Sequence, residues 1–148
     1  MNGRLLAQRL FRRVTAAHVW AYKVTGGRVG GNYRLGAGWR HPAPVLLLEH
    51  RGRRSGKRFV TPLIFARDGE RIVVVASQGG HPSNPNWFRN LQAAPDTHVW
   101  IGGKRLPVQA RVATTEQRER LWPRVVEVFA DYERYQARTS RLIPVVIL

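Results

Sequence analysis

A run of small and basic residues covers positions 52 to 58 and reads Gly-Arg-Arg-Ser-Gly-Lys-Arg. Small residues let a backbone turn tightly and expose N–H donors, while Lys and Arg side chains form point-charge and bidentate contacts with anions. The run therefore predicts a cradle for a phosphate or polycarboxylate, made of Arg53, Arg54, Ser55, Gly56, Lys57 and Arg58. It is no P-loop, because its spacing is one residue too short and Arg58 stands where Ser or Thr would hold magnesium. A solvated basic hairpin turn is the alternative.

Two weaker patterns follow along the chain. The first is the end of a predicted strand, where glycines would let a flat ligand approach the backbone and Ser77 offers both a donor and an acceptor; it comprises Val75, Ala76, Ser77, Gln78 and Gly79. The second is a short predicted helix with Asn86, Trp87, Phe88, Arg89 and Asn90. A plain loop and core aromatics are the alternative interpretations of these two segments.

Aromatic side chains recur three residues apart at Phe129, Tyr132 and Tyr135, which places them on one face of a predicted helix. Such a stripe usually belongs to a core. Two of its members carry hydroxyl groups, however, and this suits the rim of an apolar pocket that must also hydrogen-bond a polar substrate head. The stripe thus predicts either core packing or the rim of a ligand pocket.

Several kinds of chemistry are excluded by composition. The chain has no Cys, which rules out disulfides, a thiol nucleophile and cysteine-ligated metals. Its five His residues show no metal-ligand spacing, so no metal is expected. The sequence contains no serine-centred nucleophile elbow, and its nine acidic residues form no recognisable catalytic carboxylate pair. An enzyme with this sequence would need a cofactor to carry the chemistry.

The chain is strongly basic, with 25 Lys and Arg against nine Asp and Glu and a formal net charge of +16. An anionic partner is therefore expected. A nucleic-acid-binding module is one alternative, although no RNP, KH or zinc-finger motif accompanies the charge, and we expect no nucleic acid. Neither a signal sequence nor a spanning segment is apparent, so we expect a cytoplasmic protein.

The N-terminal segment, residues 1–22, is predicted to be a basic amphipathic helix beside one domain over residues 23–148. Leu6, Leu10 and Val14 recur at helical spacing over residues 4 to 21, with arginines elsewhere on the wheel. This helix either packs its apolar stripe on the core or lies on the inner face of a membrane, attracted by anionic lipid.

Beyond a glycine-rich connection over residues 24 to 44, short strands are predicted at residues 45–49, 58–66, 71–77, 97–101, 106–113 and 143–148. Asn84 is predicted to cap a short helix, and Thr114 with Gln117 forms a capping-box signature. Pro123 is expected to break the helix that follows, before a second helix over residues 124 to 138. This order favours an α+β, mainly β architecture: an antiparallel barrel with helices on its outside and the terminal strand buried.

Taken together, these motifs resemble the deazaflavin-dependent nitroreductase and quinone reductase family. The resemblance rests on residues 52–56, 60–63, 76–80, 84–91, 110–114, 122–123 and 132–136, in this order. It implies a split β-barrel related to FMN-binding barrels, reduced coenzyme F420 as the cofactor, and hydride transfer to a hydrophobic acceptor such as a quinone or nitroaromatic. An FMN- or haem-binding barrel and a cofactor carrier are the alternatives.

The resemblance also implies roles for single residues. Phosphate and tail contacts fall on Arg53 to Gly56, ring contacts on Val75 to Gln78 and on Asn86 to Asn90, and acceptor-side contacts on Tyr132, Tyr135 and Ser77. Three positions depart from the family pattern: Gln78, Phe59 and Phe129 stand where Lys, Arg and Tyr are usual.

Overall fold

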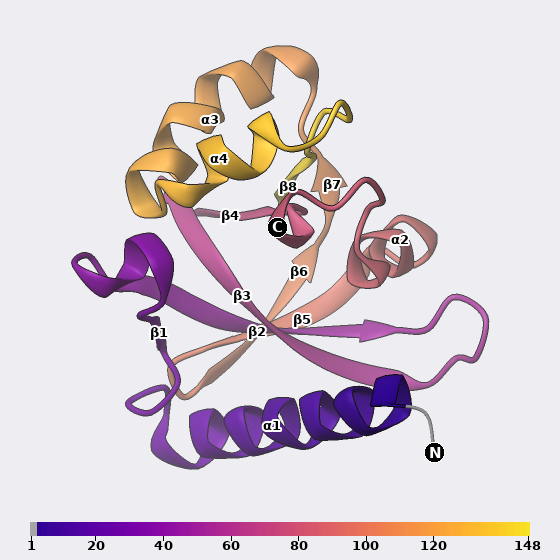
Figure 1. Ribbon diagram of the computed structural model, residues 1–148. Helices are drawn as coiled ribbons and strands as arrows, with labels where there is room; N and C mark the ends of the chain where they lie inside the picture. Colours follow the sequence, from indigo (N-terminus) through magenta and orange to yellow (C-terminus); the bar gives the residue numbers. More distant parts are fainter. Residues whose placement is uncertain (1–2) are drawn as a thin grey trace.

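The computed structural model describes residues 3–148, and its strands form one curved antiparallel sheet (Figure 1). Residues 1 and 2 of the predicted N-terminal segment lie outside the described residues. The strands are β1 (Asn32–Tyr33), β2 (Ala43–Arg51), β3 (Arg58–Asp68), β4 (Arg71–Val75), β5 (Asp96–Ile101), β6 (Lys104–Gln109), β7 (Arg111–Val112) and β8 (Val145–Ile147). Their order is β6-β5-β2-β3-β4-β8-β7, and β1 pairs with β2.

The sheet forms a nearly closed barrel, because its two outermost strands are consecutive in sequence. Only Ala110 separates β6 from β7, and its N–H donates to the Pro95 carbonyl at 2.9 Å. The chain thus leaves its pairing with β5 and joins β8 on the other side. The predicted split barrel is confirmed, whereas the single strand predicted over residues 106–113 is wrong, since it divides at this change of partner.

Helices lie around the barrel: α1 (Gly3–Thr25), α2 (Asn86–Ala93), α3 (Thr115–Val128) and α4 (Asp131–Ala137), with 3₁₀ turns η1 (Gly36–Trp39) and η2 (Gln78–Gly80). One core cluster packs α3 and α4 on β4 and β8, and a second packs α2 on β2 and β4. No helix in the described range is long and apolar enough to cross a membrane.

Two of the predicted helix boundaries are wrong. Helix α3 continues through Pro123 and ends at Val128, and the next residue, Phe129, has an extended backbone with φ of −147° and ψ of 98°. Phe129 is buried against Tyr33 and Tyr132, with ring centroids 5.4 and 5.2 Å away, so core packing decides where the helix breaks. The predicted Asn84 cap is also absent, because the Asn84 side chain accepts a hydrogen bond from Arg141 instead. The Thr114 capping box is confirmed.

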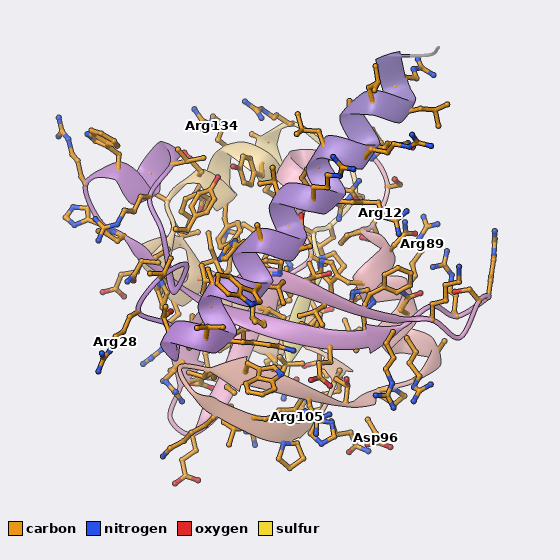
Figure 2. The ribbon with its side chains drawn as sticks, turned by 90° about the horizontal axis from the view of Figure 1, so that it is seen from below. Arg12, Arg28, Arg89, Asp96, Arg105 and Arg134 are labelled. Atoms are coloured by element: carbon orange, nitrogen blue, oxygen red, sulfur yellow. The ribbon has the colours of Figure 1, made fainter. Side chains whose placement is uncertain are left out.

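The apolar stripe of α1 does not pack on the core as one of its two interpretations expected. Leu6, Leu10 and Val14 are 50%, 65% and 60% exposed, and Tyr22 is the buried residue of the helix. Figure 2 shows the N-terminal end of α1 projecting beyond the barrel, with Arg12 part of the way along it. The helix is anchored at its C-terminal end, and its N-terminal half offers apolar and basic side chains to the surroundings.

Tyr22 supplies the anchor of α1. Its hydroxyl donates to the Val45 carbonyl at 3.0 Å, lies 3.1 Å from the Trp100 carbonyl, and accepts from the Gly102 N–H at 2.9 Å. Because a buried partner left without its hydrogen bond costs about 1 to 3 kcal/mol, we expect Tyr22→Phe to lower the free energy of unfolding by about that amount in urea denaturation. Tyr33→Phe is the control, since among residues 3–148 the Tyr33 hydroxyl has no hydrogen-bond partner. Equal losses in both variants would contradict the assignment.

Candidate active site

The basic run of residues 52 to 58 forms the turn between β2 and β3. The turn is closed by backbone bonds from the Gly52 N–H to the Lys57 carbonyl and from the Gly56 N–H to the Gly52 carbonyl, both 2.8 Å long. Inside it, the Ser55 hydroxyl accepts from the Lys57 N–H at 3.2 Å. The side chains of Arg53, Arg54, Ser55, Lys57 and Arg58 are all exposed. A small, internally bonded turn thus presents a dense positive charge.

A pocket of about 270 Å³ lies against this turn and is lined by Gly52, Arg53, Arg54, Ser55, Phe59, Asn86 and Asn90. Within the described part of the chain, the amide N–H groups of Arg54 and Ser55 have no hydrogen-bond partner. Free N–H donors beside guanidinium groups are what an anionic ligand requires. The structure therefore joins the predicted cradle to Asn86 and Asn90 of the predicted helix.

The buried side chain of Asn90 anchors the turn to the protein interior through a chain of hydrogen bonds. Its Oδ1 accepts from the Arg53 N–H at 3.1 Å and from Arg53 Nη1 at 3.0 Å, and its Nδ2 donates to His50 Nδ1 at 3.0 Å. His50 then carries its proton on Nε2 and donates to the Thr61 hydroxyl at 2.9 Å. His50 also stacks on Phe59, with ring centroids 5.5 Å apart. His50 and Thr61 were not predicted as supporting residues, because only long-range contacts bring them here.

Because of His50, the free energy of unfolding of the protein depends on pH. Its side chain is 7% exposed, and burial lowers its pKa from 6.5 to about 4. His50 therefore binds a proton near pH 6.5 in the unfolded protein but only near pH 4 in the folded protein. The free energy of unfolding falls as the pH drops from about 6.5 to about 4. We expect a loss of about 2 kcal/mol in the free energy of unfolding between about pH 7.5 and pH 5, measured in urea.

The variant His50→Gln is the control for that pH dependence, because it removes the titrating group and keeps a polar side chain. It should flatten the slope of unfolding free energy against pH over the same window, whatever its own stability. An unchanged slope would assign the effect to other groups.

The loop after β4 forms the second part of the site. Gln78, Gly79 and Gly80 all have positive φ, at 45°, 62° and 80°, so the chain turns sharply directly after Ser77. The loop packs closely on α4: a Cβ added at Gly80 would lie 2.5 Å from the Tyr135 carbonyl oxygen. Ser77 and Tyr135, predicted from separate motifs, are thus brought to one region of the surface.

Arg141 holds this loop from the other side. Its guanidinium donates to the carbonyls of Ala76 at 3.2 Å, Ser77 at 2.7 Å and His81 at 2.8 Å, and to Asn84 Oδ1 at 2.8 Å. No sequence motif pointed to Arg141, since a single arginine near a chain end carries no local signal. The segment from Ser77 to Asn90 then leads from this loop to the pocket at the basic turn.

The predicted residues divide into surface and core positions. Ser77 and Tyr135 are half-buried, while Gln78, Gly79, Asn86 and Arg89 are exposed, and Figure 2 shows Arg89 at the surface. The side chains of Val75, Ala76, Trp87, Phe88 and Tyr132 are buried in the two core clusters.

The two tyrosines differ in how far they reach solvent. Tyr132 is 5% exposed and its ring centroid lies 6.3 Å from that of Tyr135. Burial raises the pKa of both hydroxyls, so both stay protonated at neutral pH. Tyr135 is therefore the more accessible of the two hydroxyl-bearing side chains, and Tyr132 packs beside it.

Comparison with known proteins identifies the family of this chain. The family model F420H(2)-dependent quinone reductase matches residues 14–148. The chain is 55% identical over 115 residues to the putative F420H(2)-dependent quinone reductase Rv3178 of Mycobacterium tuberculosis, covering 78% of this chain and 97% of that protein. It is 40% identical over 134 residues to the F420H(2)-dependent quinone reductase Rv1261c of the same organism, covering 88% of this chain and 86% of that one.

Among solved structures, the chain is similar to an F420-H2 dependent reductase, FDR-A, with a TM-score of 0.65 and 40% identity over 70% of this chain and 92% of that one. The predicted resemblance is confirmed, and it favours coenzyme F420 over FMN, haem or a carrier role. The free amides and arginines of the basic turn form a donor set that fits the anionic groups of this coenzyme. The chain therefore belongs to the F420H(2)-dependent quinone reductase family and is an oxidoreductase that uses coenzyme F420.

Proposed function

We propose that the β2–β3 turn binds the phosphate and glutamyl tail of coenzyme F420, and that the Ser77–His81 loop contacts its ring. The observation that carries this proposal is the pocket at the turn, where the free amides of Arg54 and Ser55 lie beside guanidinium groups and buried Asn90. Asn90 holds Arg53 in place before any ligand arrives, which lowers the cost of ordering the turn on binding. Arg53, Arg54, Ser55, Gly56, Lys57 and Arg58 form the anion-binding set.

When bound, reduced coenzyme F420 supplies a hydride to the acceptor. The chain contributes orientation and electrostatic stabilisation, because hydride transfer needs a close and aligned approach rather than a protein nucleophile. Tyr135 and Ser77 donate hydrogen bonds to the acceptor oxygen, which gains negative charge as the hydride arrives. The raised pKa of Tyr135 keeps its hydroxyl proton available for this bond. Tyr132 supports Tyr135 by packing against it.

The acceptor is a hydrophobic small molecule of the quinone type, and a nitroaromatic is the second candidate. Its polar oxygens would meet Ser77 and the Tyr135 hydroxyl, and its apolar ring would lie against the ring of Tyr135.

The test is titration of the purified protein with oxidised F420, followed by fluorescence, and then oxidation of reduced F420 by menadione. Saturable binding with acceptor-dependent turnover supports the proposal. Binding without turnover would contradict the assignment of the acceptor. If neither oxidised nor reduced F420 bound, the proposed coenzyme site would be wrong. Salt-sensitive binding of single-stranded RNA in place of F420 would favour the nucleic-acid interpretation of the charge.

We further propose that the protein is cytoplasmic and that α1 rests on an anionic membrane surface. The N-terminal half of the helix exposes Leu6, Leu10, Phe11 and Val14 together with several arginines, and nothing in residues 3–148 covers them. Exposed apolar side chains beside basic ones suit the boundary between headgroups and acyl chains.

Vesicle flotation tests this membrane contact. The protein should float with vesicles rich in phosphatidylglycerol and remain free with phosphatidylcholine alone. Leu10→Glu should abolish flotation, while Glu70→Gln, a change on the exposed β3–β4 turn, should preserve it. Flotation of the Leu10→Glu variant would show that α1 is not the contact.

A further inference from the structure

The geometry points to a residue outside every predicted motif as a determinant of the coenzyme site. We propose that Arg141 is a positioning residue: it holds the Ser77–His81 loop in the shape that presents the amide N–H groups of Ser77 and Gln78 to the coenzyme ring. The inference deepens the proposed function and rests on its placement of the ring at this loop. Arg141 itself touches only protein groups.

The Arg141 guanidinium is engaged with the loop and its neighbour Asn84. Three of its nitrogens donate to four acceptors, and three of these acceptors are backbone carbonyls, of Ala76, Ser77 and His81. The two ends of the loop are therefore joined through one planar group. Lysine could not reproduce this fork, since its ammonium is a single point charge on a flexible stem.

The direction of the peptide planes determines where the loop's N–H groups point. All described peptide bonds are trans, so each N–H points opposite to the carbonyl of the same peptide unit. Because Arg141 binds the carbonyls of Ala76 and Ser77, the N–H groups of Ser77 and Gln78 point away from it. Within residues 3–148 neither N–H has a hydrogen-bond partner. The loop thus offers two donors on the side opposite Arg141.

The charge of Arg141 acts on the same N–H groups. Arg141 forms no ion pair in the described chain, and its half-buried guanidinium is bonded only to neutral oxygens. A cation behind these peptide units strengthens the N–H dipoles in front of them. Such an arrangement favours an electron-rich oxygen at the two N–H groups. The positive φ of Gln78 adds a reason for an external support, because a non-glycine residue rarely adopts this conformation unaided.

Gln136 connects Arg141 to the helix that carries the acceptor-side tyrosine. Its Nε2 donates to the Arg141 carbonyl at 2.9 Å, and its Oε1 accepts from Arg118 Nη2 and from the Ile143 N–H, both at 3.0 Å. Gln136 directly follows Tyr135 in α4. The position of Arg141 is therefore fixed by the same helix that presents Tyr135, which couples the ring-side loop to the acceptor side.

The experiment compares Arg141→Met with Arg124→Met. Arg124 is an exposed arginine on α3 whose Nη1 donates to the Arg67 carbonyl at 2.9 Å, so the control removes the same charge and one carbonyl contact. Two readouts are used: the Kd for oxidised coenzyme F420, and amide hydrogen exchange at Gly80 and His81, which donate to the carbonyls of Ser77 and Gln78. Amides of β2 and β3 report global stability in the same measurement.

Arg141→Met is expected to raise the Kd for oxidised F420 by about 10-fold or more, by analogy with the loss of residues that support the ligands of a metal site. Exchange at Gly80 and His81 should accelerate while exchange in β2 and β3 stays unchanged, and Arg124→Met should alter neither readout. Unchanged Kd and exchange in Arg141→Met would overturn the proposal, and so would acceleration of every amide alike, which is a purely structural effect.

Two further outcomes are covered. If Arg141→Met does not fold, Arg141→Lys replaces it, and wild-type Kd together with wild-type exchange in that variant would overturn the proposal. If the wild-type protein does not bind F420, the proposed function fails, while the exchange comparison still shows whether Arg141 holds the loop.

Discussion

Replacing Arg53 and Arg54 together by glutamine is expected to weaken binding of oxidised F420 by about 100-fold. A hydrogen bond to a charged group contributes about 1.5 to 3 kcal/mol, and about 1.4 kcal/mol corresponds to a factor of ten in Kd. Both arginines are exposed, so solvent screening places the expected effect at the lower end of the sum. The backbone N–H of Arg53 keeps its bond to Asn90 in this variant, and the turn retains its shape.

The control for this double variant is Arg67→Gln with Arg71→Gln on the β3–β4 hairpin, since it removes the same net charge from two exposed arginines away from the pocket. Fluorescence titration at two salt concentrations should show strong binding and a steep salt dependence in the control and a shallower one in the Arg53 and Arg54 variant. Equal weakening in both pairs would mean that the overall charge of the protein, rather than the turn, attracts the coenzyme.

The basic turn could be predicted from sequence because its signal is local. Glycines that allow a tight turn and cations that bind an anion lie within seven consecutive residues, from Gly52 to Arg58. Most strands could also be predicted, since β2, β3, β4, β5 and β8 lie where short apolar runs and turn signals placed them. Local backbone preference and the spacing of apolar residues determine these elements.

The positions that were missed or misplaced depend on contacts between distant segments. Helix α3 continues through Pro123, the stronger local signal, and ends before Phe129, whose ring is buried in the core. The Asn84 side chain does not cap the helix, because it accepts a hydrogen bond from Arg141, which lies 57 positions further along the chain. No rule based on neighbouring residues contains this information.

The aromatic residues illustrate a third limit. Trp87, Phe88 and Tyr132 matched family motifs, and the structure places all three side chains in the core. A residue type and its spacing define a face of a helix, but they do not tell which face meets a ligand. Tyr135, three positions after Tyr132, is half-buried, and its backbone lies beside the Ser77–His81 loop.

Gly80→Ala is expected to cause the largest loss at the acceptor side of the site. Two costs coincide there: Gly80 has a φ of 80°, and an added Cβ would lie 2.5 Å from the Tyr135 carbonyl oxygen. A left-handed backbone costs a non-glycine residue about 1 to 2 kcal/mol, and overpacking costs about 1 to 3 kcal/mol more. Relief of the clash must move α4 or the loop, which separates Tyr135 from Ser77. We expect kcat/KM for menadione to fall by about 100-fold, because a displacement of about 1 Å has this effect on catalysis.

Gly79→Ala separates the two costs, since Gly79 also has a positive φ, of 62°, but has nothing within 4 Å of an added Cβ. It carries only the backbone cost, about 1 to 2 kcal/mol in urea denaturation, and should retain most of its turnover. If both alanine variants lost turnover equally, the shape of the Ser77–His81 loop would matter and its contact with α4 would not. If neither variant lost turnover, the Ser77–His81 loop would not contribute to catalysis. The acceptor would then have to be oriented by residues other than Ser77 and Tyr135.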